Sequence, residues 1–329
     1  MLNQTILAAA LMLTVGAPAL AKTDAKTEKK PTETNLSIVK ARAKTSAEKK
    51  QLVEHITSEC NQVINSEHGI HMKAALNRAQ KVYDLVLENF GKESPEMVWP
   101  EFAIGHTLGD NRDSKNAIPH FEHAYTLATK YPDNPCMRAK EIEFWLFKAY
   151  LRGGKSKKAI ELVAPTLDEL EKTKNLEKLQ DYALLFMKAG ECEQADAVIR
   201  RAVACCADQN RKLLKVLQTQ IMILLRCRRF KDAIPIVEKK MELLRAKDDQ
   251  TAYADSVREV AQLSDLAERY EKSSRYYKEA IKLFREQKRD KYMIAKLLKD
   301  YSRVQRNLGR TSEADALKKE YEDLILGIK

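Results

Sequence analysis

One small residue recurs along this chain at nearly constant intervals. Its positions are Ala75, Ala117, Ala159, Ala195, Ala233, Ser273 and Ala314, separated by 42, 42, 36, 38, 40 and 41 residues. A repeat of roughly 20–50 residues with helical patterning is typical of a solenoid, in which each helix pair buries its apolar face only by stacking on its neighbours. The function of such a chain is then a property of the surface of the stack.

The residues that follow each small position carry apolar side chains on one helical face. Ala117, Phe121 and Ala124 stand at i, i+4 and i+7, the spacing that lines up on one side of an α-helix. The same stripe recurs as Ala159/Val163, Ala195/Ile199/Ala202, Ala233/Val237 and Ser273/Tyr277/Ala280. On the preceding segment, Ile104-Gly105 marks a place where one helix passes close to its neighbour, because glycine has no side chain to keep the helices apart.

With these residues the chain resembles the tetratricopeptide repeat (TPR) family. That family carries an L-G pair and a tyrosine on the first helix of each unit and A-x-x-x-F on the second; Tyr150 stands at the first-helix tyrosine, and Gly154, Gly190 and Gly309 fall near the turns within units. The resemblance covers residues 45–329. It implies an all-α, right-handed superhelical solenoid of about seven antiparallel helix pairs. The units exceed the family's usual length of about 34 residues.

Residues at the expected helix starts support the same organisation. Thr45 and Glu48 have the spacing of a capping box, and Ser94 precedes a proline, as at many helix N-termini. Aspartates at three equivalent positions, Asp208, Asp249 and Asp290, are expected to cap first helices. Prolines inside second helices predict local kinks there; they are Pro119, Pro165 and Pro235.

The N-terminal segment has a different character from the repeats. Ile6 to Val15 is a short apolar run, and Ala17 to Ala21 ends in an A-x-A site, which is typical of a secretory signal peptide cleaved after Ala21. The run is too short to span a membrane, and no integral membrane insertion is expected. We therefore expect a signal peptide at 1–21, a polar leader at 22–44 and a repeat domain at 45–329. The protein would be an exported bacterial one, periplasmic or secreted.

The charge balance suggests an anionic partner. The chain carries 58 lysines and arginines against 47 aspartates and glutamates, a formal net charge of +11. An exported protein rarely meets nucleic acid, so acidic proteins, acidic peptides or anionic envelope polymers fit a basic surface better. A solvated surface of mixed charge with no partner remains the alternative interpretation. The sequence does not indicate an oligomeric state.

Six cysteines have no spacing that is typical of a zinc site. They are Cys60, Cys136, Cys192, Cys205, Cys206 and Cys227. Cys192 and Cys227 both lie near turns within adjacent units, on one edge of the stack, so a disulfide between them is geometrically feasible. The alternative is that several cysteines are simply small buried apolar residues.

The histidines cluster in the first two units. They are His55, His68, His71, His106, His120 and His123. His120 and His123 stand at i, i+3 on one helix, a spacing that can share a metal, but no H-E-x-x-H pattern accompanies them. Motifs for catalysis, cofactor binding or phosphate binding are missing from the sequence, so we expect neither an enzyme nor a cofactor or metal site. A metal-binding protein or metal-dependent enzyme built on these histidines is the competing hypothesis.

The TPR resemblance implies a concave groove lined by first-helix residues. When the units are aligned on their small residues, thirty residues of this chain fall at the family's groove positions. Ten of them are basic and five are acidic. Those expected to contact a partner are Phe102, His106, Phe144, Lys148, Arg152, Met187, Lys188, Met222, Arg226, Lys299, Arg303 and Arg306. The sequence thus predicts a non-enzymatic scaffold or adaptor whose groove binds an acidic protein or peptide. An envelope component that binds anionic polymers is a further alternative.

Overall fold

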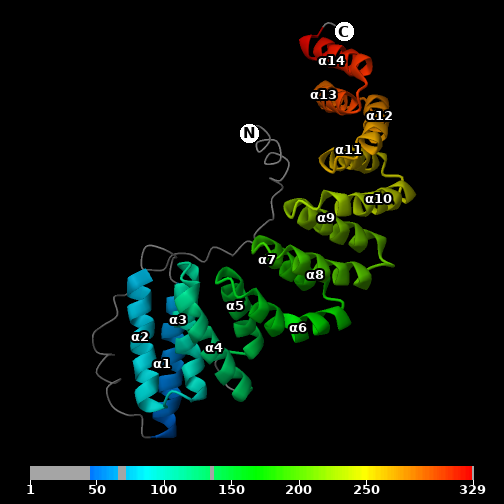
Figure 1. The fold of residues 1–329 in the computed structure, drawn as a ribbon. Helices are drawn as coiled ribbons and strands as arrows, with labels where there is room; N and C mark the ends of the chain where they lie inside the picture. Colours follow the sequence, from blue (N-terminus) through cyan, green and yellow to red (C-terminus); the bar gives the residue numbers. More distant parts are fainter. Residues whose placement is uncertain (1–44, 66–71, 134–136, 328–329) are drawn as a thin grey trace.

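The computed structural model describes residues 45–65, 72–133 and 137–327, and this part of the chain is all-α (Figure 1). The helices are α1 (Ser46–Ile64), α2 (Met72–Asn89), the short 3-10 helix η3 (Pro95–Met97), α3 (Val98–Asp110), α4 (Ser114–Lys130), α5 (Ala139–Arg152), α6 (Ser156–Lys172), α7 (Leu176–Lys188), α8 (Cys192–Cys205), α9 (Asn210–Arg226), α10 (Phe230–Ala246), α11 (Gln250–Leu266), α12 (Tyr270–Glu286), α13 (Lys291–Asn307) and α14 (Thr311–Leu326). Consecutive helices pack on one another along a curved stack. The predicted solenoid of seven helix pairs is confirmed.

The recurring small residues lie where each second helix crosses its neighbours. Ala117, Ala159 and Ala195 are fully buried, and so are Ala233 and Ala314. The serine that replaces alanine in the sixth unit, Ser273, is also fully buried, and its hydroxyl donates a hydrogen bond of 2.9 Å to the Ala261 carbonyl. Because its polar atom has a partner, serine occupies this position at little cost.

The turn inside each pair contains a residue in the left-handed region. In six units this residue stands five positions before the small residue: Arg112, Gly154, Gly190, Arg228, Glu268 and Gly309, with φ between 56° and 86°. The N–H group of the next residue donates back to the carbonyl five positions earlier, as Lys155 does to Tyr150 at 2.8 Å and Arg310 to Gln305 at 2.9 Å. This is the closing bond of a Schellman motif, which ends a helix and reverses the chain.

Helix starts follow the sequence in most places. Thr45 and Glu48 form the expected capping box, with bonds of 3.2 and 2.8 Å. The Asp249 carboxylate caps α11 and that of Asp290 caps α13. The expectation for Asp208 is wrong, since α9 begins two residues later and has Gln209 at its N-cap. Ser94 is the N-cap of η3, with Pro95 in the first turn as expected, but its hydroxyl makes no capping bond.

Prolines within second helices do not end those helices. Pro119 lies inside α4, Pro165 inside α6 and Pro235 inside α10, and each helix continues past its proline.

The expectations for residues 1–44 lie outside the described residues. These are the signal peptide at 1–21 and the polar leader at 22–44. Among the helices that the structure describes, none combines the length and apolar character that crossing a bilayer requires.

In the second unit, α3 and α4 pass close to each other at Gly105. A side-chain carbon added at Gly105 of α3 would lie 3.0 Å from the nearest ring carbon of Phe121 on α4, whereas one added at Gly109 would lie 3.7 Å from that ring. The Phe121 side chain is 1% exposed, so its neighbours enclose it. Gly105 is therefore required by packing, as the sequence predicted, and Gly109 is not.

Alanine substitutions at these two glycines should have different effects. Alanine favours an α-helix over glycine by about 1 kcal/mol, so Gly109→Ala should stabilise the protein by up to about that amount. Gly105→Ala should be less stable than Gly109→Ala by about 1–3 kcal/mol, because the added methyl group overpacks the contact with Phe121. Urea denaturation followed by circular dichroism measures both, and equal stabilities would contradict the packing argument.

Candidate partner-binding groove

Each repeat unit consists of a first and a second helix. The first helices α7, α9, α11 and α13 lie on the inner side of the curved stack, and the second helices α8, α10 and α12 lie on its outer side (Figure 1). Side chains at two equivalent positions of the first helices α5, α7, α9, α11 and α13 form two rows that run along the stack. The middle row is Lys148, Leu184, Met222, Gln262 and Arg303, and the end row, four residues further along each helix, is Arg152, Lys188, Arg226, Leu266 and Asn307. All of the end row is exposed, and the middle row is half-buried except for the exposed Arg303. These rows form the candidate groove.

The N-terminal half of the groove is a cationic surface over aromatic rings. Lys148 Nζ lies 3.9 Å from the centroid of the Trp145 ring, and that ring lies 4.4 Å from the His106 ring. An Arg152 guanidinium N–H donates to the Gly109 carbonyl at 3.1 Å. Burial, and then the repulsion of Arg152 and Lys188, lowers the pKa of Lys148, while Asp110 opposes the shift. Lys148, Arg152 and Lys188 therefore lie near one another at this end of the groove.

Four groove cations form no ion pair with any carboxylate within the described parts of the chain. They are Lys148, Arg152, Lys188 and Arg226. Half-exposed apolar side chains lie on the same helices, namely Phe144, Leu184, Met187 and Met222. An unpaired cation beside an apolar contact surface suits an acidic protein segment.

The basic residues of α13 differ, because acids of the same stack lie beside them. Arg303 pairs with Asp265 of α11 and, at 3.7 Å, with Asp300. Arg306 pairs with Asp315 of α14 at 2.8 Å. Lys299 Nζ lies 5.9 Å from the Tyr321 ring centroid. Of the three α13 cations expected in the groove, Arg303 and Arg306 are thus paired with acids of the same stack.

Two of the residues expected to line the groove are buried beneath its surface. Phe102 is 2% exposed and His106 is 6% exposed, so neither side chain offers a contact surface to a partner. The Phe102 ring packs against Phe121 and Trp145 at centroid distances of 5.6 and 6.3 Å. The expectation that both contact a partner is corrected here: α3 is covered on every side, and its aromatic residues form the base under Trp145.

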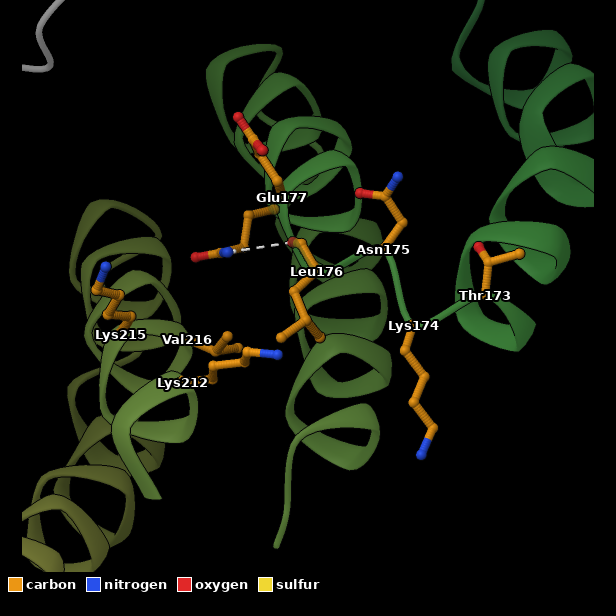
Figure 2. A pocket seen from close by; sticks show the side chains of 9 residues that line it. Thr173, Lys174, Asn175, Leu176, Glu177, Lys212, Lys215 and Val216 are labelled. Carbon is orange, nitrogen blue, oxygen red and sulfur yellow. Dashed lines mark hydrogen bonds between the residues drawn. The ribbon is translucent and has the colours of Figure 1, made fainter. Parts of the chain in front are cut away.

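A surface depression lies between α7 and α9 (Figure 2). Its volume is about 670 Å³, and its lining is Thr173, Lys174, Asn175, Leu176, Glu177, Gln180, Lys212, Lys215 and Val216. The Gln180 side-chain amide donates to the Leu176 carbonyl at 3.1 Å and accepts from the Thr219 hydroxyl at 2.8 Å. The depression therefore lies at the N-terminal halves of the two helices whose C-terminal ends carry Lys188 and Arg226.

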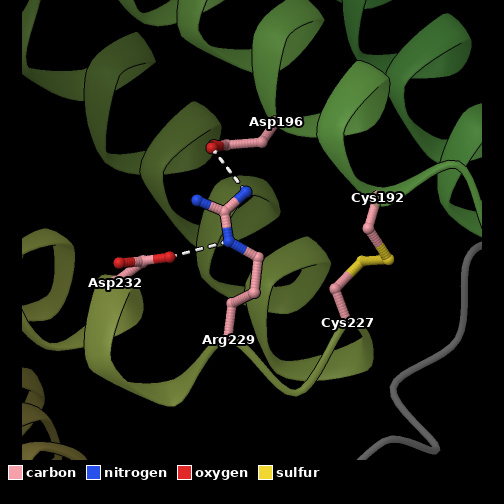
Figure 3. Close-up of a disulfide and its surroundings, with 5 residues drawn as sticks. All are labelled: Cys192, Asp196, Cys227, Arg229 and Asp232. Atoms are coloured by element: carbon pink, nitrogen blue, oxygen red, sulfur yellow. Dashed lines mark hydrogen bonds and ion pairs between the residues drawn. A yellow bond between two sulfur atoms is a disulfide. The ribbon is translucent and has the colours of Figure 1, made fainter.

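A disulfide links the start of α8 to the turn after α9, as the sequence allowed. Cys192 at the start of α8 is bonded to Cys227 just after α9, with 5.8 Å between the two Cα atoms (Figure 3). Beside it, the Arg229 guanidinium donates to buried Asp196 at 3.0 Å and to Asp232 at 2.7 Å. Lys188 and Arg226 stand next to these turns, so the disulfide and the ion pairs hold together the helix ends from which the two groove cations project.

The remaining described cysteines are packed into the stack. Cys60 and Cys206 are buried and Cys205 is half-buried. The Cys206 thiol donates to the Ala202 carbonyl at 3.2 Å. Burial raises the pKa of the Cys205 and Cys206 thiols, which disfavours the reactive thiolate form. Cys136 lies outside the described residues.

The paired histidines of α4 share a carboxylate that sequence reasoning missed. Nδ1 of His120 and Nδ1 of His123 each donate to a different oxygen of Glu101 on α3, both at 2.6 Å, and Glu101 is 4% exposed. A carboxylate only accepts, so both Nδ1 atoms carry protons. The sequence signal was Glu101 itself, an acid inside an otherwise apolar helix.

The metal hypothesis gains no ligand set from this arrangement. In the part of the chain that the structure describes, no group of three or more histidine, cysteine, aspartate or glutamate side chains is placed to hold a metal ion. His68 and His71 lie outside that part. The Glu101 cluster joins α3 to α4 and supports the groove base.

Comparison with known proteins gives structural matches only. No family model matches the sequence. No curated protein sequence is similar to it. Among solved structures, a Podosopora anserina protein with nearly identical TPR-like repeats is 14% identical, with 61% of this chain and 96% of that chain covered at a TM-score of 0.42. The apo form of RapI is 13% identical, with 83% of this chain and 76% of that chain covered at a TM-score of 0.41. Aspartyl phosphate phosphatase F from Bacillus subtilis is 11% identical, with 87% of this chain and 76% of that chain covered at a TM-score of 0.39.

Removing the shared carboxylate should destabilise the α3–α4 contact. Glu101→Leu keeps the side-chain size but leaves two ring N–H groups without their acceptor, so the free energy of unfolding should fall by about 1–3 kcal/mol. Glu88→Leu is the matched control: Glu88 is exposed on α2 and its change should stay within about 0.5 kcal/mol. Equal stabilities of the two variants in urea denaturation would show that Glu101 has no structural role.

Removing the disulfide should weaken the middle of the stack. The double variant Cys192→Ser/Cys227→Ser should lose about 2–4 kcal/mol of unfolding free energy, because the unfolded chain is no longer cross-linked. Thermal unfolding of the oxidised protein, with and without reductant, measures the same quantity. Reductant should leave the double variant unaffected, and a wild-type protein insensitive to reductant would contradict the cross-link.

Proposed function

We propose that this protein is a non-enzymatic scaffold whose groove binds an acidic segment of another protein. The observation that carries the proposal is a set of cations on α5, α7 and α9 that form no ion pair with a carboxylate among the residues the structure describes, namely Lys148, Arg152, Lys188 and Arg226. They stand beside half-exposed apolar side chains such as Leu184 and Met222. Apolar contacts supply affinity, while the charges steer association and reject basic partners.

The cations of the groove act mainly on recognition. Exposed charges accelerate the encounter with an oppositely charged partner, and salt screens them over about 8–10 Å. Lys148 differs from the others because it is half-buried and its pKa is lowered. A partner carboxylate beside it relieves the repulsion from Arg152, so binding at this point also stabilises the charged form of Lys148.

We also propose that the protein works in an exported compartment. The A-x-A site that ends at Ala21 suggests cleavage of a signal peptide. The disulfide between Cys192 and Cys227 is consistent with this proposal, because disulfides persist in oxidising compartments. N-terminal sequencing of the mature protein should begin at Lys22, whereas recovery of intact Met1 from a cytosolic fraction would exclude the proposal.

Photo-crosslinking in intact cells tests the binding surface. A photoreactive residue in place of Met222, on the inner face of α9, should form a discrete adduct with a partner protein. The same residue in place of Glu242, an exposed position on the outer helix α10, should not. Adducts of equal yield at both positions would exclude the groove, and diffuse adducts with non-protein envelope material would favour the polymer-binding alternative.

Charge reversal should separate the groove from overall charge. The triple variant Arg152→Glu/Lys188→Glu/Arg226→Glu should slow association with the captured partner by at least about tenfold at low salt, since steering charges act on the association rate. The control Lys172→Glu/Lys239→Glu/Lys278→Glu changes net charge equally at exposed positions of the outer helices α6, α10 and α12. Equal slowing in both, measured by surface plasmon resonance at several salt concentrations, would show that only net charge matters.

A further inference from the structure

Two of the four groove cations are held in place by other groups of the molecule. Lys148 Nζ lies over two rings of its own helix, 3.9 Å from the centroid of Trp145 and 5.5 Å from that of Phe144. Arg152, one helical turn further along α5, donates to the Gly109 carbonyl of α3 at 3.1 Å. Residues at i and i+4 are neighbours on one helix face, with Cβ atoms about 5–6 Å apart. The two held cations therefore stand side by side near the end of α5.

The other two groove cations are not held in this way. Lys188 of α7 and Arg226 of α9 are exposed, and among the described residues neither side chain makes a hydrogen bond, an ion pair or a ring contact. Ordering a long, free side chain opposes binding, whereas a side chain that is already held loses little freedom when a ligand contacts it. Close contact with a partner is therefore favoured at α5.

We infer that Lys148 and Arg152 together bind one carboxylate of the partner, on an acidic side chain that stands beside an apolar residue. Lys188 and Arg226 act on the encounter alone. This inference rests on the proposed function and specifies the chemistry of its partner. A carboxylate has two oxygens that each accept hydrogen bonds, so an ammonium and a guanidinium group on neighbouring residues of one helix face can share it.

The electrostatics around Lys148 support a shared anion. Burial, and then the repulsion of Arg152 and Lys188, lowers the pKa of Lys148. On α3, Asp110 opposes the shift and pairs with His106 at 3.3 Å. A carboxylate between Lys148 and Arg152 relieves their repulsion. Because Lys148 is half-buried, salt screens that contact less than contacts at exposed cations, and we expect the contact to act mainly on the dissociation rate.

The apolar residue beside the acid follows from the position of Phe144. Its ring lies next to the Lys148 ammonium and packs edge-on against Tyr182 of α7, with 6.1 Å between the ring centroids. Phe144 is only half-buried, so part of its surface is open to a ligand that already contacts Lys148. An apolar side chain next to the acid packs there and removes that surface from water, which adds to the affinity.

Labelled peptides that differ in one carboxylate test the shared site. The probe is amidated at its C-terminus and carries one Leu-Glu-Leu core between flanks that contain aspartates. Replacing the core glutamate with glutamine should weaken binding at least about tenfold, mainly through faster dissociation, because the held contact is lost. Replacing one flanking aspartate with asparagine should cost less than about threefold and act on the association rate. Stopped-flow fluorescence measures both; equal effects, or a probe that does not bind, would overturn the inference.

Methionine substitutions test whether the two cations share one carboxylate. Methionine keeps an apolar stem in place and removes the charge. Lys148→Met and Arg152→Met should each weaken probe binding at least about tenfold, and the double variant should lose less than the product of the two losses, because a carboxylate released by one cation is no longer held for the other. Lys148→Met combined with Arg226→Met is the control, and its losses should multiply. Losses that multiply for Lys148 and Arg152 as well would overturn the inference.

The pH dependence of binding separates direct contact from a structural role. The pKa of Lys148 is lowered in the free protein, and a bound carboxylate favours the charged amine and raises the pKa again. Binding therefore takes up a proton, and affinity should fall as the pH rises through the pKa of Lys148 in the free protein. Lys148→Arg keeps the charge and does not titrate in this range.

Probe affinity is to be measured below about pH 9.5, where lysines of ordinary pKa keep most of their charge. It should decline with pH for the wild-type protein and stay level for Lys148→Arg, which should still bind. An equal decline in both proteins, or none in the wild type, would overturn the inference.

The two proposals fail in distinguishable ways. If the photoreactive residue at Met222 captures a partner in cells but the probe does not bind, or binds without using its core glutamate, the groove is a binding surface and the shared carboxylate site is wrong. If the probe behaves as expected, the inference stands independently of which cellular partner is captured.

Discussion

The contact on which the structure depends is the close crossing of helices at one small residue per unit. At Ala117, Ala159 and Ala195 the side chain is fully buried, and a larger one would separate the second helix from its neighbours. Because interiors are packed as densely as organic crystals, this contact fixes the distance and orientation of each pair. Everything at a constant sequence offset from the small residue then falls at a constant place on the stack.

The groove residues recur at regular places because each stands at a constant number of residues from the small residue of its unit. Each turn closes with a left-handed residue five positions before the small residue, and the end-row residue stands two positions before that. Arg152 precedes Gly154, Lys188 precedes Gly190 and Arg226 precedes Arg228 in this way. The Schellman turn ends the first helix at a fixed point. A side chain at the end of that helix is therefore presented at the same edge of every unit, and substitutions there change the surface without disturbing the core.

Local pattern was sufficient to predict the fold, because a solenoid depends on contacts between neighbouring units. The spacing of the small residues, the close approach at Gly105 and the possible Cys192–Cys227 bridge were all readable from the repeat register. The alignment failed where burial depends on several helices together: Phe102 and His106 hold groove positions by register but are covered by neighbouring elements. Glu101 was missed because its partners His120 and His123 come from the next helix, and a single sequence does not show which side chains meet across it.

The number of basic residues at groove positions is not sufficient to predict the charge that a partner meets there. Lys148 and Arg303 hold equivalent positions in the middle row, yet the first has no carboxylate partner in the described chain and the second pairs with Asp265, 38 residues earlier. The field that a partner meets depends on where the acids lie, since a paired carboxylate cancels most of a cation's potential at distances larger than the separation of the two charges. Acids of α11 and α14 pair with Arg303 and Arg306 at the C-terminal end of the groove. Lys148, Arg152, Lys188 and Arg226 form no ion pair with a described carboxylate, and the proposed attraction for an anionic segment rests on these four residues.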